Sequence, residues 1–169
     1  MDIESSGRST LACVDEDIEQ AVVRAGIDVE TIKAGAIYAS AGNGHVAMID
    51  ARDIAEVAAS VLTMGGHAGE SLVLTGGEAV TYADVAAAFA TEFGHDVQYV
   101  DVPPEVTRQN LLRFGLPAGQ VEDILALFAI FRAGYASTVT PTVAKVLGRA
   151  PRSLTTFVHD YRLAFTDPA

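Results

Sequence analysis

The chain has 169 residues, the size of one ordinary domain, and 50% of them are hydrophobic, so a packed core is expected. The formal net charge of −11, with Lys33 and Lys145 as the only lysines, argues against nucleic acid and against an anionic membrane surface as partners. No apolar run is long enough to span a bilayer, and the first ten residues lack the apolar core of a secretory signal. Cys13 is the only cysteine, which excludes an internal disulfide and fits a reducing, cytoplasmic setting.

The chain begins with a polar, serine-rich tail over residues 1–12, which we expect to be disordered. Residues 14–25 have apolar side chains at helical spacing and three acids in the first turn, which together predict a helix. β-Branched and apolar residues predict a strand over 29–34, and a glycine-containing loop is expected over 35–44. A short strand is predicted over 45–49.

Helices and strands continue to alternate through the middle of the chain. We expect helices over 51–64 and 82–93 and strands over 71–74 and 97–102. Asp50 and Thr81 precede the two helices as N-caps, and Gly65 and Gly94 follow them, as expected of helix ends. The last third of the chain is helical, with helices predicted over 105–114, 121–135, 141–148 and 153–165.

This alternation predicts an α/β fold with a parallel sheet, followed by a helical C-terminal part. One structural domain is expected, composed of the disordered tail 1–12, an α/β region over 13–102 and a helical region over 103–169. The three or four predicted strands are fewer than a usual doubly wound sheet contains, which suggests that part of such a fold is missing.

No sequence motif identifies a catalytic residue. The nearest match to a Gly-x-Gly-x-x-Gly phosphate loop is Gly42-Asn43-Gly44, which lacks the third glycine and leads into a strand instead of a helix. No tyrosine has a lysine four residues later, and a Gly-x-Ser-x-Gly nucleophile elbow is absent. The four histidines are scattered singly, so no metal site is predicted, and helix capping explains Asp50 and Asp53. The catalytic residues are therefore unknown at this point.

Several segments, taken in order, resemble the C-terminal half of the NmrA-like branch of atypical short-chain dehydrogenases/reductases. They are DIE…AGI followed by VETIK at 17–33, HVAMIDARDIA at 45–55, LVLTG at 72–76 with TYADVA at 81–86, QYVDVP at 98–103, and TPTV, GRAPR and Phe157 in the last thirty residues. The resemblance covers about 85% of the chain and about the second half of a typical family member. No single segment is decisive, but their order and spacing together are fairly specific.

The resemblance implies a partial Rossmann-like parallel sheet with a C-terminal helical substrate-side subdomain, and NAD(P) as cofactor. It also implies either reductase activity on a quinone-like or carbonyl small molecule or a non-catalytic, redox-sensing role. The glycine-rich loop of the family belongs to an N-terminal half that this sequence does not contain, so the chain alone is expected to bind NADPH weakly.

Family resemblance also places the site residues. Lys33 and Ala34 stand where relatives carry Arg-Pro beside the nicotinamide, so the cofactor-binding residues expected from the resemblance are Lys33, Ala34 and Gly35. The loop that follows is shortened, and with the helix over 121–135 it is expected to wall a substrate pocket. The residues assigned to that pocket are Ala36, Ile37, Tyr38, Phe128 and Phe131.

Three interpretations of the function remain open: a truncated NAD(P)-dependent oxidoreductase, a non-catalytic module that binds a small ligand, and a structural partner that completes another chain's sheet. Without a preceding half, the strand over 29–34 would have an open edge with unpaired backbone groups. We therefore expect a homodimer, or a partner chain, at that edge. The alternative is that residues 1–13 fold back over the edge and keep the chain monomeric.

Overall fold

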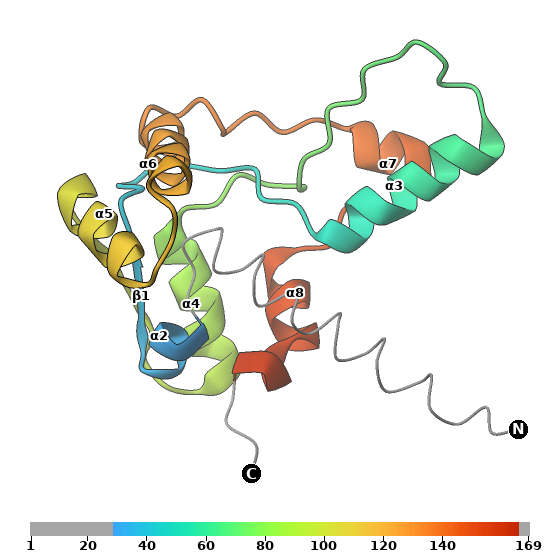
Figure 1. Cartoon of the computed structure of the whole chain (residues 1–169). Helices are drawn as coiled ribbons and strands as arrows, with labels where there is room; N and C mark the ends of the chain where they lie inside the picture. The colour runs from blue at the N-terminus through green and yellow to red at the C-terminus, as the bar shows by residue number, and fades with distance from the viewer. Residues whose placement is uncertain (1–28, 166–169) are drawn as a thin grey trace, which may run out of the picture.

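The computed structural model describes residues 29–165 (Figure 1). Its sheet consists of β1 (Ala36–Ala39) and β2 (Gln98–Asp101), which pair in parallel with Ala36 opposite Gln98. Parallel neighbours need a long crossover, and here the crossover contains two helices. The fold is therefore α/β with a parallel sheet and a helical C-terminal part, as the sequence predicts. Within the described residues, no helix is long and apolar enough to cross a membrane.

The predicted strand over 29–34 is wrong: these residues form the short helix α2 (Val29–Lys33). Val29 and Ile32 are three positions apart and both buried, a spacing that suits one face of a helix. Gly35, with a φ of +87°, ends the turn, and the strand begins directly after it. The loop expected over 35–44 is therefore wrong at its start, because Ala36–Ala39 form β1.

The predicted strand over 71–74 is also wrong, because this segment has no ladder with another strand in the described part of the chain. Val73 is 61% exposed, so the apolar run does not mark a buried strand here. The short strand predicted over 45–49 is reduced to a single antiparallel bridge between Val46 and Val80. The predicted helix over 14–25 and the tail over 1–12 lie outside the described residues.

The two central helices begin and end where their caps predict. In α3 (Ala51–Met64), the Asp50 side chain accepts a hydrogen bond from the Arg52 backbone N–H, and Gly65 follows the last turn. In α4 (Tyr82–Phe93), Thr81 and Asp84 form a reciprocal capping box. Both N-termini thus have local side-chain partners for backbone groups that would otherwise be unpaired.

The C-terminal helices follow the predicted order with shifted ends: α5 (Pro104–Arg113), α6 (Ala118–Arg132), α7 (Thr142–Leu147), α8 (Leu154–Asp160) and the 3₁₀ turn η1 (Arg162–Phe165). Proline begins α5 at a position where its missing N–H costs nothing. The single helix predicted over 153–165 is divided, because α8 ends before Tyr161 and η1 continues in a tighter turn.

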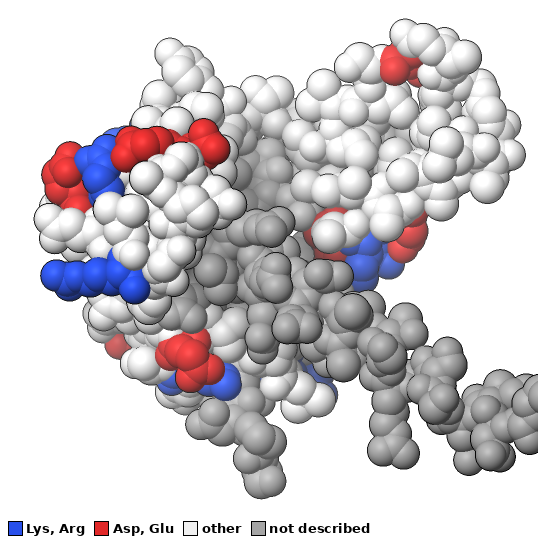
Figure 2. All heavy atoms as spheres, in the orientation of Figure 1, with Lys and Arg blue, Asp and Glu red and all other residues white. Residues whose placement is uncertain are grey.

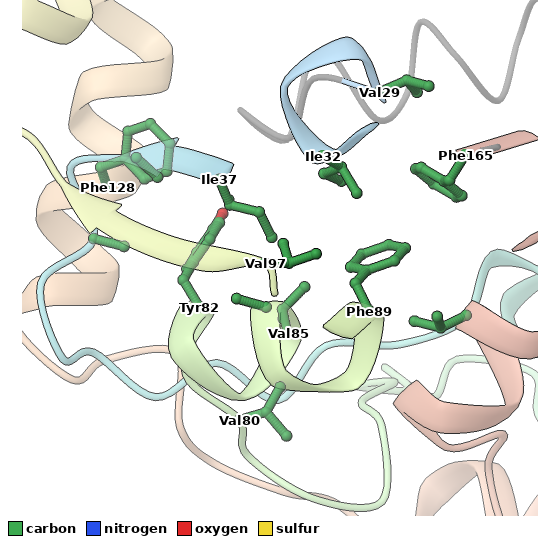
Figure 3. Packing of buried hydrophobic residues seen from close by; sticks show 14 residues of the cluster. Val29, Ile32, Ile37, Val80, Tyr82, Val85, Phe89, Val97, Phe128 and Phe165 are labelled. Carbon is green, nitrogen blue, oxygen red and sulfur yellow. The ribbon is translucent and has the colours of Figure 1, made fainter. Parts of the chain in front are cut away.

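The main core lies where α4 packs against both strands of the sheet (Figure 3). Ile37 of β1 and Phe89 of α4 are almost completely buried there, and Phe165 packs against Phe89 with ring centroids 4.8 Å apart. Helices α3 and α7 pack on each other and form a lobe beside this core (Figure 1). Helices α5 and α6 pair on the other side, above the ends of the strands.

Candidate functional site

Polar side chains meet where the two parallel strands end. Open α/β sheets bind ligands outside the carboxyl ends of their strands, so this edge is the first place to look for a site. Arg132, the last residue of α6, donates from Nη2 to the backbone carbonyl of Ser40 and to Asp101 Oδ1, both at 2.9 Å. Arg132 Nη1 has no hydrogen-bond partner within residues 29–165, so one face of the guanidinium remains available.

Two buried hydroxyls hold the chain that leaves β1 against the chain that leaves β2. Ser40 Oγ donates to the Val102 carbonyl at 2.8 Å and lies 2.6 Å from Thr107 Oγ1. Since the single proton of Ser40 goes to Val102, Thr107 donates to Ser40. These hydrogen bonds hold Ser40, whose backbone carbonyl accepts from Arg132.

Tyr99 completes the cluster from β2. Its hydroxyl lies 3.2 Å from the Ala39 carbonyl and 3.1 Å from Asp101 Oδ1, to which it can donate. Burial, and then the neighbouring Asp101 carboxylate, raise the pKa of Tyr99 to about 12. The phenol is therefore protonated at neutral pH and acts as a hydrogen-bond donor instead of a base.

The glycine-rich loop Gly42-Asn43-Gly44 lies against the end of α6. The Gly42 N–H donates to Asp101 Oδ1 at 3.0 Å, and its φ is +57°. A Cβ placed on Gly44 would lie 2.1 Å from the backbone carbonyl oxygen of Phe131, so only glycine permits this contact. The sequence analysis explained these glycines by a turn alone, and the close approach to α6 is an additional reason that the motif could have suggested.

The residues predicted to bind cofactor lie next to one another before β1, and their role remains a prediction. Lys33 ends α2, where its Nζ is 3.1 Å from Glu30 Oε1. Gly35 is needed for its positive φ and for its close approach to the Asp96 carbonyl. Ala34 lies between them in the turn that leads into β1. The structure thus brings these three residues together at the start of β1, at the opposite end of that strand from the polar cluster.

The five residues assigned to a substrate pocket divide between the core and the surface. Ile37 and Phe128 are buried in the hydrophobic core, and Phe131 packs partly against it. Figure 3 shows Ile37, Phe128 and the Tyr82 ring close together at one end of this cluster. Tyr38 is half-exposed on the other face of β1, and Ala36 is partly buried beside α2. Their role in a ligand site remains a prediction.

An apolar cavity of about 580 Å³ opens elsewhere, between α4, α8 and the segment that precedes α3. Its volume is in the range typical of small-molecule sites. Aromatic and aliphatic side chains make up most of its lining: Met48, Ile49, Val80, Val85, Phe89, Leu154, Phe157, Tyr161 and Phe165. None of the residues assigned from sequence to a cofactor or substrate site lines this cavity. The sequence does not distinguish apolar side chains that line a cavity from those that pack in the core.

Ion pairs surround Asp50, which lines this cavity at the start of α3. Arg52 binds both carboxylate oxygens of Asp50, extends to Asp160 at 2.7 Å and lies 5.0 Å above the Tyr161 ring. Hydrogen bonds from Arg52 lower the pKa of Asp50 more than burial of that carboxyl raises it. Figure 2 shows acidic and basic side chains meeting at the base of the α3–α7 lobe, where these helices meet the rest of the fold.

The chemistry available in the described residues is binding and polarisation. No histidine within residues 29–165 is hydrogen-bonded to a serine or threonine hydroxyl. No group of three His, Cys, Asp or Glu residues in the same part could hold a metal ion. Arg132 and Tyr99 could orient and polarise an acceptor oxygen at the strand ends.

Comparison with known proteins decides the family. The sequence profile of the NmrA-like family matches residues 15–158. The chain belongs to the NmrA-like family. Among relatives of this NmrA-like chain, an NAD(P)H azoreductase of Xenophilus azovorans is 37% identical over 131 residues, which are 78% of this chain and 46% of that protein. Quinone oxidoreductase 2 of Escherichia coli (strain K12) is 32% identical over 95 residues, which are 56% of this chain and 33% of that protein.

Solved structures agree on the NmrA-like fold. The Citrobacter sp. triphenylmethane reductase complexed with NADP(H) superposes with a TM-score of 0.70 at 26% identity, covering 78% of this chain and 46% of that chain. An NADPH-dependent quinone oxidoreductase from Escherichia coli gives a TM-score of 0.74 at 24% identity, covering 85% of this chain and 51% of that chain. The chain spans about half the length of the relatives it matches, or less.

NADP(H) is bound by at least one NmrA-like relative, so the described residues can be tested against its pyrophosphate. A pyrophosphate site needs unpaired backbone N–H groups at a helix N-terminus. The N-terminus of α3 is capped by the Asp50 carboxylate, and that of α4 by Thr81 and Asp84, whose acids would repel phosphate. The backbone of Gly76 packs against the Met48 carbonyl instead. The N-termini of α3 and α4 therefore do not fit the pyrophosphate of a dinucleotide.

Proposed function

We propose that this chain is the acceptor-side portion of an NAD(P)H-dependent oxidoreductase that reduces a quinone-like or carbonyl small molecule. Family membership supports the reaction class, since relatives are named as an azoreductase, a quinone oxidoreductase and a triphenylmethane reductase. The observation that carries the proposal is the hydrogen-bonded polar cluster at the strand ends, where Arg132 Nη1 has no partner within residues 29–165 and both Arg132 and the protonated phenol of Tyr99 contact Asp101.

The acceptor would bind with its carbonyl oxygen on Arg132 Nη1. A guanidinium that is already held by two acceptors needs no reorganisation when negative charge develops on a bound oxygen. Asp101 and the Ser40 carbonyl accept hydrogen bonds from Arg132 and hold its side chain. The Tyr99 hydroxyl can donate a hydrogen bond to Asp101 in turn. In this proposal the cluster selects for an acceptor with an exposed oxygen.

The proposal assigns dinucleotide phosphate binding to a segment outside residues 29–165, because the N-termini of α3 and α4 are already occupied by acidic caps. It also includes a partner at the open edge of β1. The Gln98 N–H donates to the Gly35 carbonyl and the Val102 N–H to the Ala39 carbonyl, so Ala36 and Tyr38 direct their backbone groups away from β2. The partner is a second copy or the polypeptide that carries the phosphate site.

A cytoplasmic location belongs to the same proposal, since the single cysteine allows no internal disulfide.

Two binding measurements test the acceptor site and the cofactor assignment. The purified chain is titrated with 1,4-naphthoquinone by calorimetry, and separately with NADPH by nucleotide fluorescence. We expect measurable quinone binding that Arg132→Gln weakens about tenfold, and only weak NADPH binding. Arg113→Gln is the matched control, because Arg113 lies in the last turn of α5, away from the strand ends. Equal quinone binding by both variants would refute the acceptor site, and a low-micromolar dissociation constant for NADPH would refute the cofactor assignment.

A second candidate function is a non-catalytic ligand-binding module. It is favoured by one observation, that the N-termini of the two central helices α3 and α4 are capped by their own acidic side chains instead of being open to a phosphate. Quinone that binds with the Arg132 dependence above, but is not reduced when the chain is supplied with NADPH in large excess, would decide for this module. Sedimentation at micromolar concentration tests the partner: a clean monomer would remove the second copy from the proposal.

A further inference from the structure

We infer that the apolar cavity between α4 and α8 binds an organic cation whose body is aromatic and apolar. This site is separate from the polar cluster at the strand ends, and its residues come from different elements. The inference therefore stands or falls without NADPH and without the proposed reductase activity. It rests on the shape and lining of the cavity and on the charges around its mouth.

Aromatic rings from α4, from α8 and the residue after it, and from η1 suit a flat, unsaturated body. Phe89 and Phe165 lie with centroids 4.8 Å apart, and Phe157 and Tyr161 with centroids 4.9 Å apart, and all four rings line the cavity. Such edges and faces attract aromatic guests and cations. A volume of about 580 Å³ accommodates a molecule of three or four fused or linked rings.

The charged side chains at the mouth of the cavity favour a ligand with a positive charge. Arg152 is the one cation in the described lining, and it is held by Asp53 and Glu56, both acids. Asp50 in turn is neutralised by Arg52. Glu78 remains: its carboxylate is exposed and makes no ion pair or hydrogen bond within residues 29–165.

A second, smaller hollow of about 490 Å³ adjoins the first and shares Glu78, Val80 and Leu154 with it. Its other ionisable lining residues are Asp84 and Glu92, also acids. Asp84 stays charged, since hydrogen bonds from Thr81 lower the pKa of that carboxyl. His159 of α8 does not line this hollow, but its Nδ1 lies 3.0 Å from Glu92 Oε1.

The first hollow is apolar and can hold the body of the ligand, whereas the second hollow, lined by acids, forms an anionic shelf beside it. Glu78 lines both hollows. A cationic group placed on the shelf would find one unpaired carboxylate and two more nearby, whereas an anion would meet repulsion. An aromatic cation therefore fits both halves of the site, and a neutral aromatic molecule fits only one.

Ethidium is a suitable probe, because it is a planar aromatic cation whose fluorescence rises in an apolar site, and anilinonaphthalene sulfonate is its anionic counterpart. We expect ethidium to bind the full chain at least tenfold more tightly than the sulfonate. Glu78→Gln should weaken ethidium about fivefold to tenfold, and Glu78→Lys should abolish ethidium binding and strengthen the sulfonate. Glu78 is exposed, so neither variant is expected to unfold the protein.

Glu70→Gln is the control for non-specific attraction to an acidic chain. It removes the same charge from an exposed loop residue that lines neither hollow. Unchanged ethidium binding in Glu70→Gln, with the losses above in the Glu78 variants, supports the inference. Equal binding of the two dyes by the unmodified chain, or equal effects of Glu70→Gln and Glu78→Gln, would overturn it.

Discussion

Asp53 is the most deeply buried carboxylate of the described chain, and its removal is the sharpest test of what holds α3 to the C-terminal segment. Its side chain is 0% exposed. It accepts hydrogen bonds from the Arg152 backbone N–H and from Arg149, each at 2.7 Å, and also from the Arg152 guanidinium. Asp53→Asn keeps the shape of the side chain and removes its charge.

The expected loss of unfolding free energy is about 3 kcal/mol. Breaking a buried ion pair costs roughly 3–5 kcal/mol when a charge is left buried and unpaired. The low end applies here because both arginines are partly exposed and keep a second partner, Glu56. Glu56→Gln is the matched control: it lies three residues away on α3 and binds the same two arginines, but it is exposed, so its loss should be a small fraction of the Asp53 loss.

The assay is urea unfolding followed by far-ultraviolet circular dichroism, which needs no tryptophan. Burial raises the pKa of Asp53, but hydrogen bonds from Arg152 and Arg149 together lower it by more than burial raises it. The pKa of Asp53 therefore lies below the usual value of 3.8. A carboxylate with a lowered pKa in the folded state stabilises above about pH 4 and ceases to do so as the pH falls through the folded pKa. The stability advantage of the unmodified chain over Asp53→Asn should therefore shrink on acidification below pH 4. The reasoning fails if both variants lose the same stability, or if the advantage is the same at pH 7 and pH 3.

Two further predictions concern packing. Gly44→Ala should lower the free energy of unfolding by about 2 kcal/mol, because its Cβ would collide with the Phe131 carbonyl. Gly119 lies in α6 with open space around its Cβ position, so Gly119→Ala should leave stability unchanged or raise it in the same urea assay. Phe89→Ala should cost about 4 kcal/mol, since this ring is 1% exposed at the centre of the core, whereas Phe114→Ala, at 74% exposure, should leave the midpoint of unfolding nearly unchanged. Losses of similar size within either pair would show that the packing described above is not what stabilises the fold.

Helix positions were the most predictable part of this fold. The sequence predicts α3 over 51–64 and α4 over 82–93, and the structure has the same bounds. Asp50, the Thr81 capping box and the glycines at both C-termini act within a few residues of the helix end, so their effect is visible in the sequence alone.

Strand positions were less predictable, since a strand exists only where another backbone pairs with it. The β-branched run over 29–34 has strand propensity, yet it forms α2, because Val29 and Ile32 reach the core from one helical face. The less distinctive sequence AIYA at Ala36–Ala39 becomes β1 because β2 lies alongside it. The apolar run over 71–74 has no pairing strand in the described residues and forms none.

The candidate sites were hard to predict for the same reason: they are formed by segments that are distant in the sequence. Arg132, Asp101 and Ser40 lie far apart in the chain and belong to no motif, so only the packing of α6 over the strand ends brings them together. Of the residues assigned to a substrate pocket, Ile37 and Phe128 are buried in the core, and their role in a site remains a prediction.

The sequence by itself determined the family, the α/β class and the ends of the central helices, because the order of local signals along the chain contains that information. Only the tertiary structure decided which segment near residue 35 becomes the strand, where the cavity opens and which charge at its mouth lacks a partner. Those properties depend on contacts between residues remote in sequence, and the free energy of such contacts depends on burial and pairing that no short segment determines.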